Sequence, residues 1–223
     1  MTSGGLNIHH LYFLLIGAGW TICLSIIAFV GGGIGGGAIA LARISPLRWV
    51  RWLAIGYIQL IQGTPLLVVL FVCYFGISIL GFSLPGIVAA GLAMVVYVSA
   101  YLGEIWRGCI ESVAKTQWEA AECLALSRTQ RMRLVILPQA VRIATPPTVG
   151  FMVQIVKNTS LASIVGFVEL VRAGQLINNS IFQPFMVYVL IAVLYFAMCY
   201  PLSAWSRKLE RRMQFSARPV AEA

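Results

Sequence analysis

The stretch Thr116–Pro147, TQWEAAECLALSRTQRMRLVILPQAVRIATPP, decides how this chain is expected to fold. It is the only long segment that is both charged and helical in pattern, and the runs on either side of it are almost wholly apolar. A charged segment between two membrane spans has to face water, because burying its charges in lipid costs too much free energy. We therefore expect a soluble partner to reach the protein here.

Two pairs in this stretch have the spacing of a capping box, in which two side chains satisfy the free amides of a helix's first turn. Thr116 with Glu119 predicts a helix that begins near Gln117. Ser127 with Gln130 predicts that this helix ends near Ser127 and that a second one begins there.

Three prolines are expected to limit the second helix. Pro138 lacks a backbone donor, and Pro146 with Pro147 should prevent a smooth continuation into the next span. The prediction is therefore two short helices with a bend between them, lying across the membrane surface.

The composition indicates that the bilayer is the solvent of this chain. Of its 223 residues, 60% are hydrophobic and 10% are charged, with a mean hydropathy of +0.88. So few charges could not cover that much apolar surface in water. We expect an all-α integral membrane protein with five transmembrane helices and a cytoplasmic coupling helix.

The net charge of +9 indicates topology rather than nucleic-acid binding. The basic residues gather in three groups, within 43–51, 107–142 and 207–218, and only Lys157 and Arg172 fall outside them. If the three groups lie on one side, the positive-inside rule makes that side cytoplasmic. The first ten residues carry no Lys or Arg, so we expect the N-terminus outside and the C-terminus inside.

The expected organisation is an extracytoplasmic tail (residues 1–10), a membrane domain (11–212) and a cytoplasmic tail (213–223). No basic region precedes the first apolar run, so a cleavable signal peptide is not predicted. The fourth span is too short for about 30 Å of hydrocarbon unless it recruits flanking residues. The expected spans are Leu11–Leu41, Ile55–Leu80, Gly86–Trp106, a fourth around Thr148–Val156, and Phe185–Trp205.

The run GGGIGGG at Gly31–Gly37 lies inside the first expected span. Its small residues four apart favour close helix packing. It is not read as a nucleotide-binding loop, because no strand precedes it and no Lys-Ser/Thr follows.

Gly63–Pro65 is expected to interrupt the helix of the second span, either as a packing kink or as backbone that lines a cavity. This break, the Gln154–Ser160 segment and Glu169 interrupt the apolar walls, and we hypothesise that they line a substrate pathway. Glu169 is an ionisable group near the membrane, which favours a function, although an ordinary pair with Arg172 explains it equally well. Glu104 and Arg107 are expected to form such a pair at the end of the third span. The pathway candidates are Gln62, Thr64, Gln154, Asn158, Thr159, Ser160 and Glu169.

The five cysteines and two histidines have no ligand or disulfide spacing, so no metal site is predicted. Nor does any His, Cys or carboxylate cluster have catalytic spacing, which disfavours an enzyme.

The central stretch resembles the EAA signature of the membrane subunits of bacterial ABC importers. Glu119-Ala120-Ala121 and Ile136-Leu137-Pro138 match it at the family's spacing. Ala125 stands where the family has Gly. Because Ala is also small, we expect this change to be mild, and any left-handed residue in the bend to lie elsewhere.

Further motifs resemble the permeases of polar amino acid importers in particular. They are QGTPLLVVLF, AYLGEIWRGCIESVAKTQWEAA and KNTSLASIVGFVEL, and the resemblance extends from about Leu11 to Arg212. Gln59 and Gln62 stand where the family commonly has Glu and Arg. Because both charged residues are replaced, the assignment of an ion-based gate to this place is weakened.

The resemblance implies a permease dimer, of one chain or two related chains, in the bacterial inner membrane. Cytoplasmic ATP-binding subunits would bind the ATP, so this chain needs no cofactor, and an extracytoplasmic binding protein would deliver an amino acid and largely set specificity. The ATPase-coupling residues implied are Glu119, Ala120, Ala121, Ala125, Leu137 and Pro138.

Two other functions are weighed against this one. A self-contained secondary transporter would need its own ion-coupling site, yet the chain contains no Asp. It would transport without ATP. A non-transporting membrane assembly or regulatory protein predicts that charge reversal at Glu119 leaves uptake intact.

Overall fold

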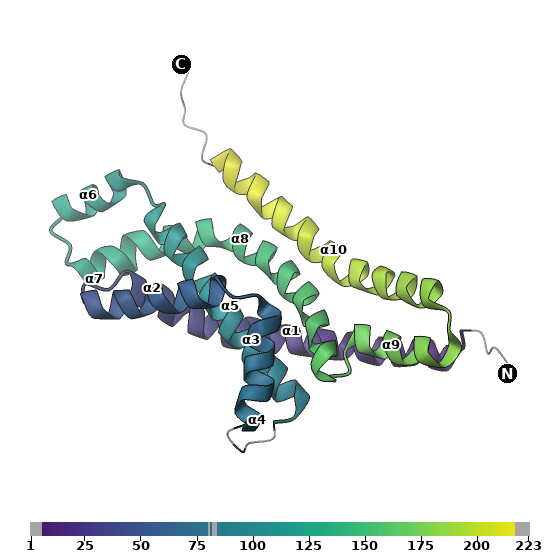
Figure 1. Ribbon diagram of the computed structural model, residues 1–223. Helices are drawn as coiled ribbons and strands as arrows, with labels where there is room; N and C mark the ends of the chain where they lie inside the picture. The colour runs from purple at the N-terminus through teal and green to yellow at the C-terminus, as the bar shows by residue number, and fades with distance from the viewer. Residues whose placement is uncertain (1–5, 80, 82–83, 217–223) are drawn as a thin grey trace.

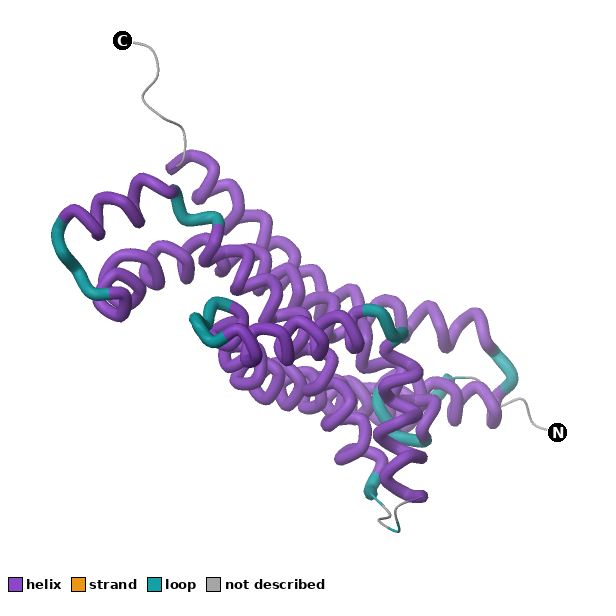
Figure 2. Tube along the Cα trace, turned by 60° about the vertical axis from the view of Figure 1, so that its left-hand side comes forward, coloured by secondary structure: helices purple, strands orange, loops and turns teal. Residues whose placement is uncertain are grey.

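The computed structural model describes residues 6–79, 81 and 84–216, and none of these residues is in a β-strand. Figure 2 shows helices along almost the whole trace, joined by short loops. The elements are α1 (Ile8–Arg43), α2 (Arg48–Gln62), α3 (Leu66–Phe71), α4 (Ile77–Ile79), α5 (Gly86–Glu111), α6 (Lys115–Cys123), α7 (Arg128–Gln130), α8 (Leu137–Asn158), α9 (Leu170–Ile181) and α10 (Pro184–Ser216), with π-helical turns at Val72–Gly76 and Arg131–Ile136 and a 3-10 helix at Thr159–Val165.

Four helical segments are long and apolar enough to cross a bilayer: Ile8–Arg43, Gly86–Glu111, Arg128–Val165 and Pro184–Met213. The all-α membrane fold is therefore confirmed. The expected second span is a bent pair, in which Arg48–Gln62 and Leu66–Ile79 meet at 102°. The number of spans is four, or up to five if the pair counts as one. The predicted boundaries at residues 10–11 and 212–213 lie inside α1 and α10.

The bend between α2 and α3 lies at Gly63–Pro65, where the sequence predicted an interruption. Gly63 ends α2 with its N–H bonded to the Gln59 carbonyl at 2.9 Å. Pro65 then precedes α3 in an extended conformation. Proline has no backbone N–H to donate, and it disfavours helical backbone at the residue before it. For these reasons α2 cannot continue through Pro65 into α3.

The glycine run packs α1 against α5, as the sequence predicted. A Cβ at Gly32 would lie 2.4 Å from a Val98 methyl group, and one at Gly36 would lie 2.9 Å from the Leu102 Cβ. Val98 and Leu102 are fully buried. Larger residues at either glycine would push the two helices apart, so the run is a packing surface.

The expected break at Pro146 and Pro147 does not occur, and this prediction was wrong. Both prolines lie inside α8, which runs without interruption from Leu137 to Asn158. The two prolines leave the carbonyls of Arg142 and Ile143 without their helical donors. Two hydroxyl groups bond to other carbonyls nearby: Thr145 donates to the Val141 carbonyl at 2.8 Å, and Ser206 of α10 donates to the Pro146 carbonyl at 3.1 Å. These contacts are additional to the helix and do not replace the two lost bonds.

The second predicted surface helix is consequently not a separate element. It begins at Arg128, passes through the π-helical turn and continues into α8. Pro138 directly follows this turn and cannot donate to the carbonyl four residues before it, which accounts for the local widening. Of the two predicted surface helices, only α6 is a short helix separate from a membrane span.

At the ends of the molecule, α6 lies opposite the N-terminus, at the end where α10 finishes (Figures 1 and 2). Figure 1 shows α10 beside α8 and set apart from much of the bundle. Of the four long segments, α10 is also the least buried. Much of its surface is therefore left to lipid or to another chain.

Candidate coupling and pathway sites

The helix α6 begins earlier than predicted, at Lys115, with Ala114 as its N-cap residue. The N–H of Gln117 bonds to the Ala114 carbonyl at 2.9 Å, so Thr116 already lies in the first turn. No side chain caps this helix. The predicted capping box of Thr116 and Glu119 was therefore wrong, because the backbone of Ala114 starts the helix two residues sooner.

The end of α6 overturns the expectation for Ala125, which has a left-handed backbone with φ of +53°. The N–H of Leu126 bonds to the Ala121 carbonyl, and the N–H of Ala125 bonds to the Glu122 carbonyl at 2.8 Å. These two bonds form a Schellman motif, whose left-handed position favours glycine. Ala costs about 1 kcal/mol there relative to glycine, so replacing the family's glycine is not mild.

The second predicted cap is confirmed. Ser127 is the N-cap of α7, and its hydroxyl accepts the Gln130 N–H at 3.4 Å. The Gln130 side chain accepts the Ser127 N–H at 2.9 Å. The turn between α6 and α7 is thus fixed by a Schellman motif on one side and a capping box on the other.

The predicted coupling residues differ in how far their side chains are exposed to solvent. The exposed ones are Glu119, Ala120, Ala125 and Pro138, while Leu137 is half-buried. Ala121 is only 2% exposed, so it packs against its own chain. A protein that covers α6 from outside would meet the first set, and the small side chains of the two exposed alanines allow a close approach.

Side chains connect α6 to the rest of the chain. The amide of Gln139 on α8 donates to the side-chain oxygen of Gln117 at 3.2 Å. Arg131 forms an ion pair with Glu122 at 3.1 Å. Below them, Val113, Ile136 and other residues form an apolar cluster. α6 is therefore joined to the segment that leads into α8 by both polar and apolar contacts.

A second connection reaches the loop after α1, where the Arg128 guanidinium donates to the Ile44 carbonyl at 3.2 Å. Close by in sequence, Arg43 lies 3.6 Å from Glu104. The predicted pair of Glu104 and Arg107 is present, with a hydrogen bond of 3.0 Å. Arg107 also contacts Glu111. The pair of Arg43 and Glu104 joins the ends of α1 and α5, whereas the two pairs of Arg107 lie within α5.

The structure brings together two of the predicted pathway residues on α8: the amide of Gln154 donates to Asn158 at 3.3 Å. Asn158 is also within reach of the Tyr97 hydroxyl on α5. Gln62 and Thr64 lie at the bend between α2 and α3, and within the described ranges neither bonds to that pair. The hydroxyl of Thr64 donates to the Leu60 carbonyl at 2.7 Å.

The next two candidates follow at the end of α8. Thr159 is fully buried, and its hydroxyl donates to the Val156 carbonyl at 2.7 Å. Ser160 is half-buried and donates to the Lys157 carbonyl. Both hydroxyls are thus used by the backbone, whereas Gln62 and Gln154 are exposed.

Glu169 is fully buried and caps α9. Its carboxylate accepts the N–H groups of Val171 and Arg172, each at 2.9 Å, and the Tyr195 hydroxyl at 3.0 Å. Burial raises the pKa of this carboxyl, and the three hydrogen bonds oppose the rise. The Arg172 guanidinium turns instead to Gln175. The side-chain pair considered for Glu169 is therefore not formed.

Two partners at this site were not found from the sequence. Tyr195 of α10 binds the Glu169 carboxylate, and the Thr21 hydroxyl of α1 accepts the Leu170 N–H at 3.2 Å. Both are remote in sequence and belong to apolar spans, so no local pattern pointed to them. Together they join α1, α9 and α10 at one buried point.

All five cysteines carry free thiols. No group of three or more His, Cys, Asp or Glu side chains that could hold a metal ion occurs in the described part of the chain.

Comparison with known proteins gives consistent results. Residues 32–215 match the family model described as binding-protein-dependent transport system inner membrane component. The chain is 37% identical to the probable amino-acid ABC transporter permease protein YckA of Bacillus subtilis, over 90% of this chain and 88% of that protein. It is 33% identical to the glutamine transport system permease protein GlnP of Escherichia coli, over 90% and 93%.

Solved structures agree. A crystal structure of an amino acid ABC transporter with histidines superposes with a TM-score of 0.88 and 32% identity, covering 92% of this chain and 96% of that one. An inward-facing structure of the MetNI methionine ABC transporter has a TM-score of 0.71 at 16% identity, over 92% and 99% of the two chains. The second likeness concerns the fold alone.

Proposed function

The chain belongs to the family of inner membrane components of binding-protein-dependent transport systems, and from this premise we propose how its two candidate sites work. It is a multi-pass permease subunit of an amino-acid ABC importer. In this family ATP hydrolysis lies in a separate subunit. The proposal concerns how this chain couples to that subunit and where the amino acid passes.

We propose that α6 docks on a cytoplasmic ATPase subunit. The observation that carries this is the combination of an exposed face with Glu119 and Ala120 and a firm connection to α8 through Gln117 and Gln139. Coupling needs both properties, because a docked helix transmits motion only if it is joined to a span. The coupling set is Glu119, Ala120, Ala125, Leu137 and Pro138 at the surface, with Ala121 holding α6 from beneath.

The unbroken helix α8 would carry this motion into the membrane. Gln139 contacts α6, and Gln154 lies fifteen positions further along the same helix, a rise of about 22 Å. Closure of an ATP-bound pair of ATPase subunits would shift α6, and α8 would then tilt. Gln154 and Asn158 would move with it, alternating between outward-facing and inward-facing arrangements.

We propose that the amino acid passes along Gln62, Thr64, Gln154, Asn158 and Ser160, whose amides and hydroxyls interrupt apolar walls. An ammonium and a carboxylate need such polar partners. Thr159 and Glu169 are buried, so in this arrangement they would shape the pathway from behind. The ATP is bound by the partner subunit, so this chain needs no cofactor.

The proposed orientation follows from the charges. The central basic group lies mostly on the segments before and after α6, from the end of α5 to the start of α8, and the basic end of α10 finishes at the same end of the molecule. By the positive-inside rule this end is cytoplasmic, with the N-terminus outside and the C-terminus inside. A second permease chain, the same or related, and an extracytoplasmic amino acid binding protein would complete the assembly.

Reconstitution tests the proposal. Proteoliposomes that hold this chain, its ATPase subunits and its second permease chain receive the binding protein outside and ATP inside, and uptake is screened across labelled amino acids. We expect ATP-dependent uptake of at least one amino acid, lost in Glu119→Arg and retained in the control Glu210→Arg, which reverses an exposed charge on α10. Uptake that persists without ATP would support a secondary transporter instead.

A further inference from the structure

Two apolar cavities lie between α1 and α8; α5 and Trp205 of α10 complete the lining of one, and four residues of α10 complete that of the other. The larger has a volume of about 660 Å³ and lies between Leu41 of α1 and Trp205 of α10. The smaller, about 400 Å³, lies further along the same helices, beside Ile22. Phe29 and Met152 line both, so the two form one groove, which we call the α1–α10 groove.

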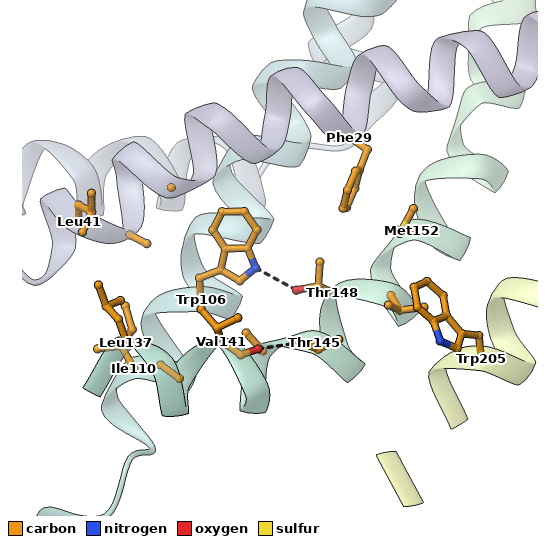
Figure 3. A pocket seen from close by; sticks show the side chains of 15 residues that line it. Phe29, Leu41, Trp106, Ile110, Leu137, Val141, Thr145, Thr148, Met152 and Trp205 are labelled. Atoms are coloured by element: carbon orange, nitrogen blue, oxygen red, sulfur yellow. Dashed lines mark hydrogen bonds between the residues drawn. The ribbon is translucent and has the colours of Figure 1, made fainter. Parts of the chain in front are cut away.

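Figure 3 shows the wider part of this groove, with Phe29 and Leu41 on one side and Met152 and Trp205 on the other. Two of the polar side chains in view are already hydrogen-bonded. The indole N–H of Trp106 donates to Thr148 at 2.9 Å, and the Thr145 hydroxyl donates to the backbone. The indole nitrogen of Trp205 is drawn without a hydrogen bond. The transported amino acid, which carries two charges, would find no charged partner among the lining residues. The groove is therefore unsuited to the pathway.

The length of the groove can be compared with the bilayer. From Ile22 to Leu41 it follows α1 over a rise of about 28 Å, close to the full hydrocarbon thickness of about 30 Å. An acyl chain that enters from one leaflet reaches about half of that distance. It would therefore occupy the wider part of the groove, between Leu41 and Phe29.

The wide end of the groove is basic. Lys208 follows Trp205 by three residues, so it lies on the same face of α10, and it is exposed. Arg142 directly follows the lining residue Val141 on α8 and is exposed as well. Basic pockets between membrane helices on the cytoplasmic side select anionic lipid headgroups. Trp205 itself suits the boundary between hydrocarbon and headgroups.

We propose that the α1–α10 groove binds an anionic phospholipid, with an acyl chain between α1 and α10 and the headgroup phosphate at Lys208 and Arg142. The bound chain supplies packing that α10 lacks, since α10 is the least buried of the four long segments. Lipid thereby becomes a structural part of the contact between α10 and the bundle. This site is separate from both α6 and the pathway.

Quenching by brominated lipids tests the site, because Trp106 lines the groove. The full complex is reconstituted in phosphatidylethanolamine vesicles that contain either brominated phosphatidylglycerol or brominated phosphatidylcholine at equal amounts. The contribution of Trp106 is the difference between the wild type and Trp106→Phe. We expect brominated phosphatidylglycerol to quench Trp106 at a concentration about 25-fold lower than brominated phosphatidylcholine, because each of the two cation-headgroup contacts provides about fivefold.

Matched variants localise the effect. Ala144→Phe, which fills the groove, should protect Trp106 from both lipids, whereas Ala192→Phe on the exposed side of α10 should not. Arg142→Glu with Lys208→Glu should remove the preference for phosphatidylglycerol, and Arg207→Glu with Arg211→Glu should keep it. Equal quenching by the two lipids in the wild type would overturn the headgroup assignment. A Trp106 that neither lipid quenches would mean that protein covers the groove, and would overturn the whole proposal.

Discussion

The guanidinium of Arg131 lies 3.1 Å from the carboxylate of Glu122, across the turn that contains Ala125. This ion pair joins the end of α6 to the start of the helical segment that becomes α8. Glu122 is 70% exposed, so the pair contributes little stability by itself. Its importance is geometric, because it marks the point at which a docked α6 and a membrane-spanning helix are held together.

The left-handed backbone of Ala125 predicts an unusual gain from glycine. Ala125→Gly should stabilise the turn by about 1 kcal/mol, because it removes the steric cost of a Cβ at positive φ. Ala120→Gly, within α6, should destabilise by a similar amount, because glycine weakens helix interiors. Hydrogen exchange of the 117–131 amides should thus slow about fivefold in the first variant and quicken in the second. Slower exchange in both, or in neither, would contradict the Schellman assignment.

The two predicted caps differ in a way that substitution can detect. Ser127→Ala should cost about 1 kcal/mol in the stability of the α6–α7 turn, because the Gln130 amide loses its acceptor. Thr116→Ala should cost little, because Thr116 caps nothing. The exchange rate of the Gln130 amide distinguishes the two. Equal effects of both substitutions would mean that the start of α6 is assigned incorrectly.

Close packing of α1 on α5 makes Gly32 sensitive to size. Gly32→Val should lower the stability of the purified complex by about 1–3 kcal/mol, because the new side chain overlaps Val98. Gly19→Val is the matched control on the same helix, where an added Cβ meets nothing within 4 Å. Thermal unfolding followed by circular dichroism measures both. A tolerated Gly32→Val would show that the glycine run does not hold α5.

We expect the buried carboxylate of Glu169 to contribute mainly to the stability of the fold. Glu169→Ala should destabilise by at least about 1–3 kcal/mol, because the Tyr195 hydroxyl and two N–H groups lose their acceptor. Arg172→Ala should have a smaller effect, since that guanidinium does not contact Glu169. Thermal unfolding gives the stability, and uptake at matched expression gives the function. Uptake lost at unchanged stability would instead place Glu169 in the pathway.

Sequence patterns predicted the features that depend on local chemistry. The apolar runs located the long spans, the glycines located the α1–α5 contact, and Ser127 with Gln130 located a helix start. Each signal lies within a few residues of the feature that it specifies. The family resemblance was equally reliable, because its motifs cover most of the chain.

The failures share a physical cause, which is that remote or backbone groups decide the outcome. The break expected at Pro146 is absent, and in the continuous helix Ser206, sixty residues away, bonds to the Pro146 carbonyl. The start of α6 is set by the backbone of Ala114, which leaves no side-chain signal. Ala125 adopts the left-handed conformation because the hydrogen bonds of the turn require it. Of these, the continuity of α8 matters most, because a broken α8 could not carry motion from α6 to Gln154.

Docking of α6 on the ATPase subunit can be measured by cross-linking from Cys123. It is exposed at the end of α6, whereas Cys109 and Cys199 are buried and Cys23 and Cys73 are half-buried in membrane helices. A bifunctional maleimide is applied to the reconstituted complex, whose ATPase subunit carries one surface cysteine in its membrane-facing groove. We predict a product with the combined mass of permease and ATPase, absent in Cys123→Ser and strongly reduced in Glu119→Arg. No combined product in the wild type, or an undiminished one in Glu119→Arg, would contradict the account.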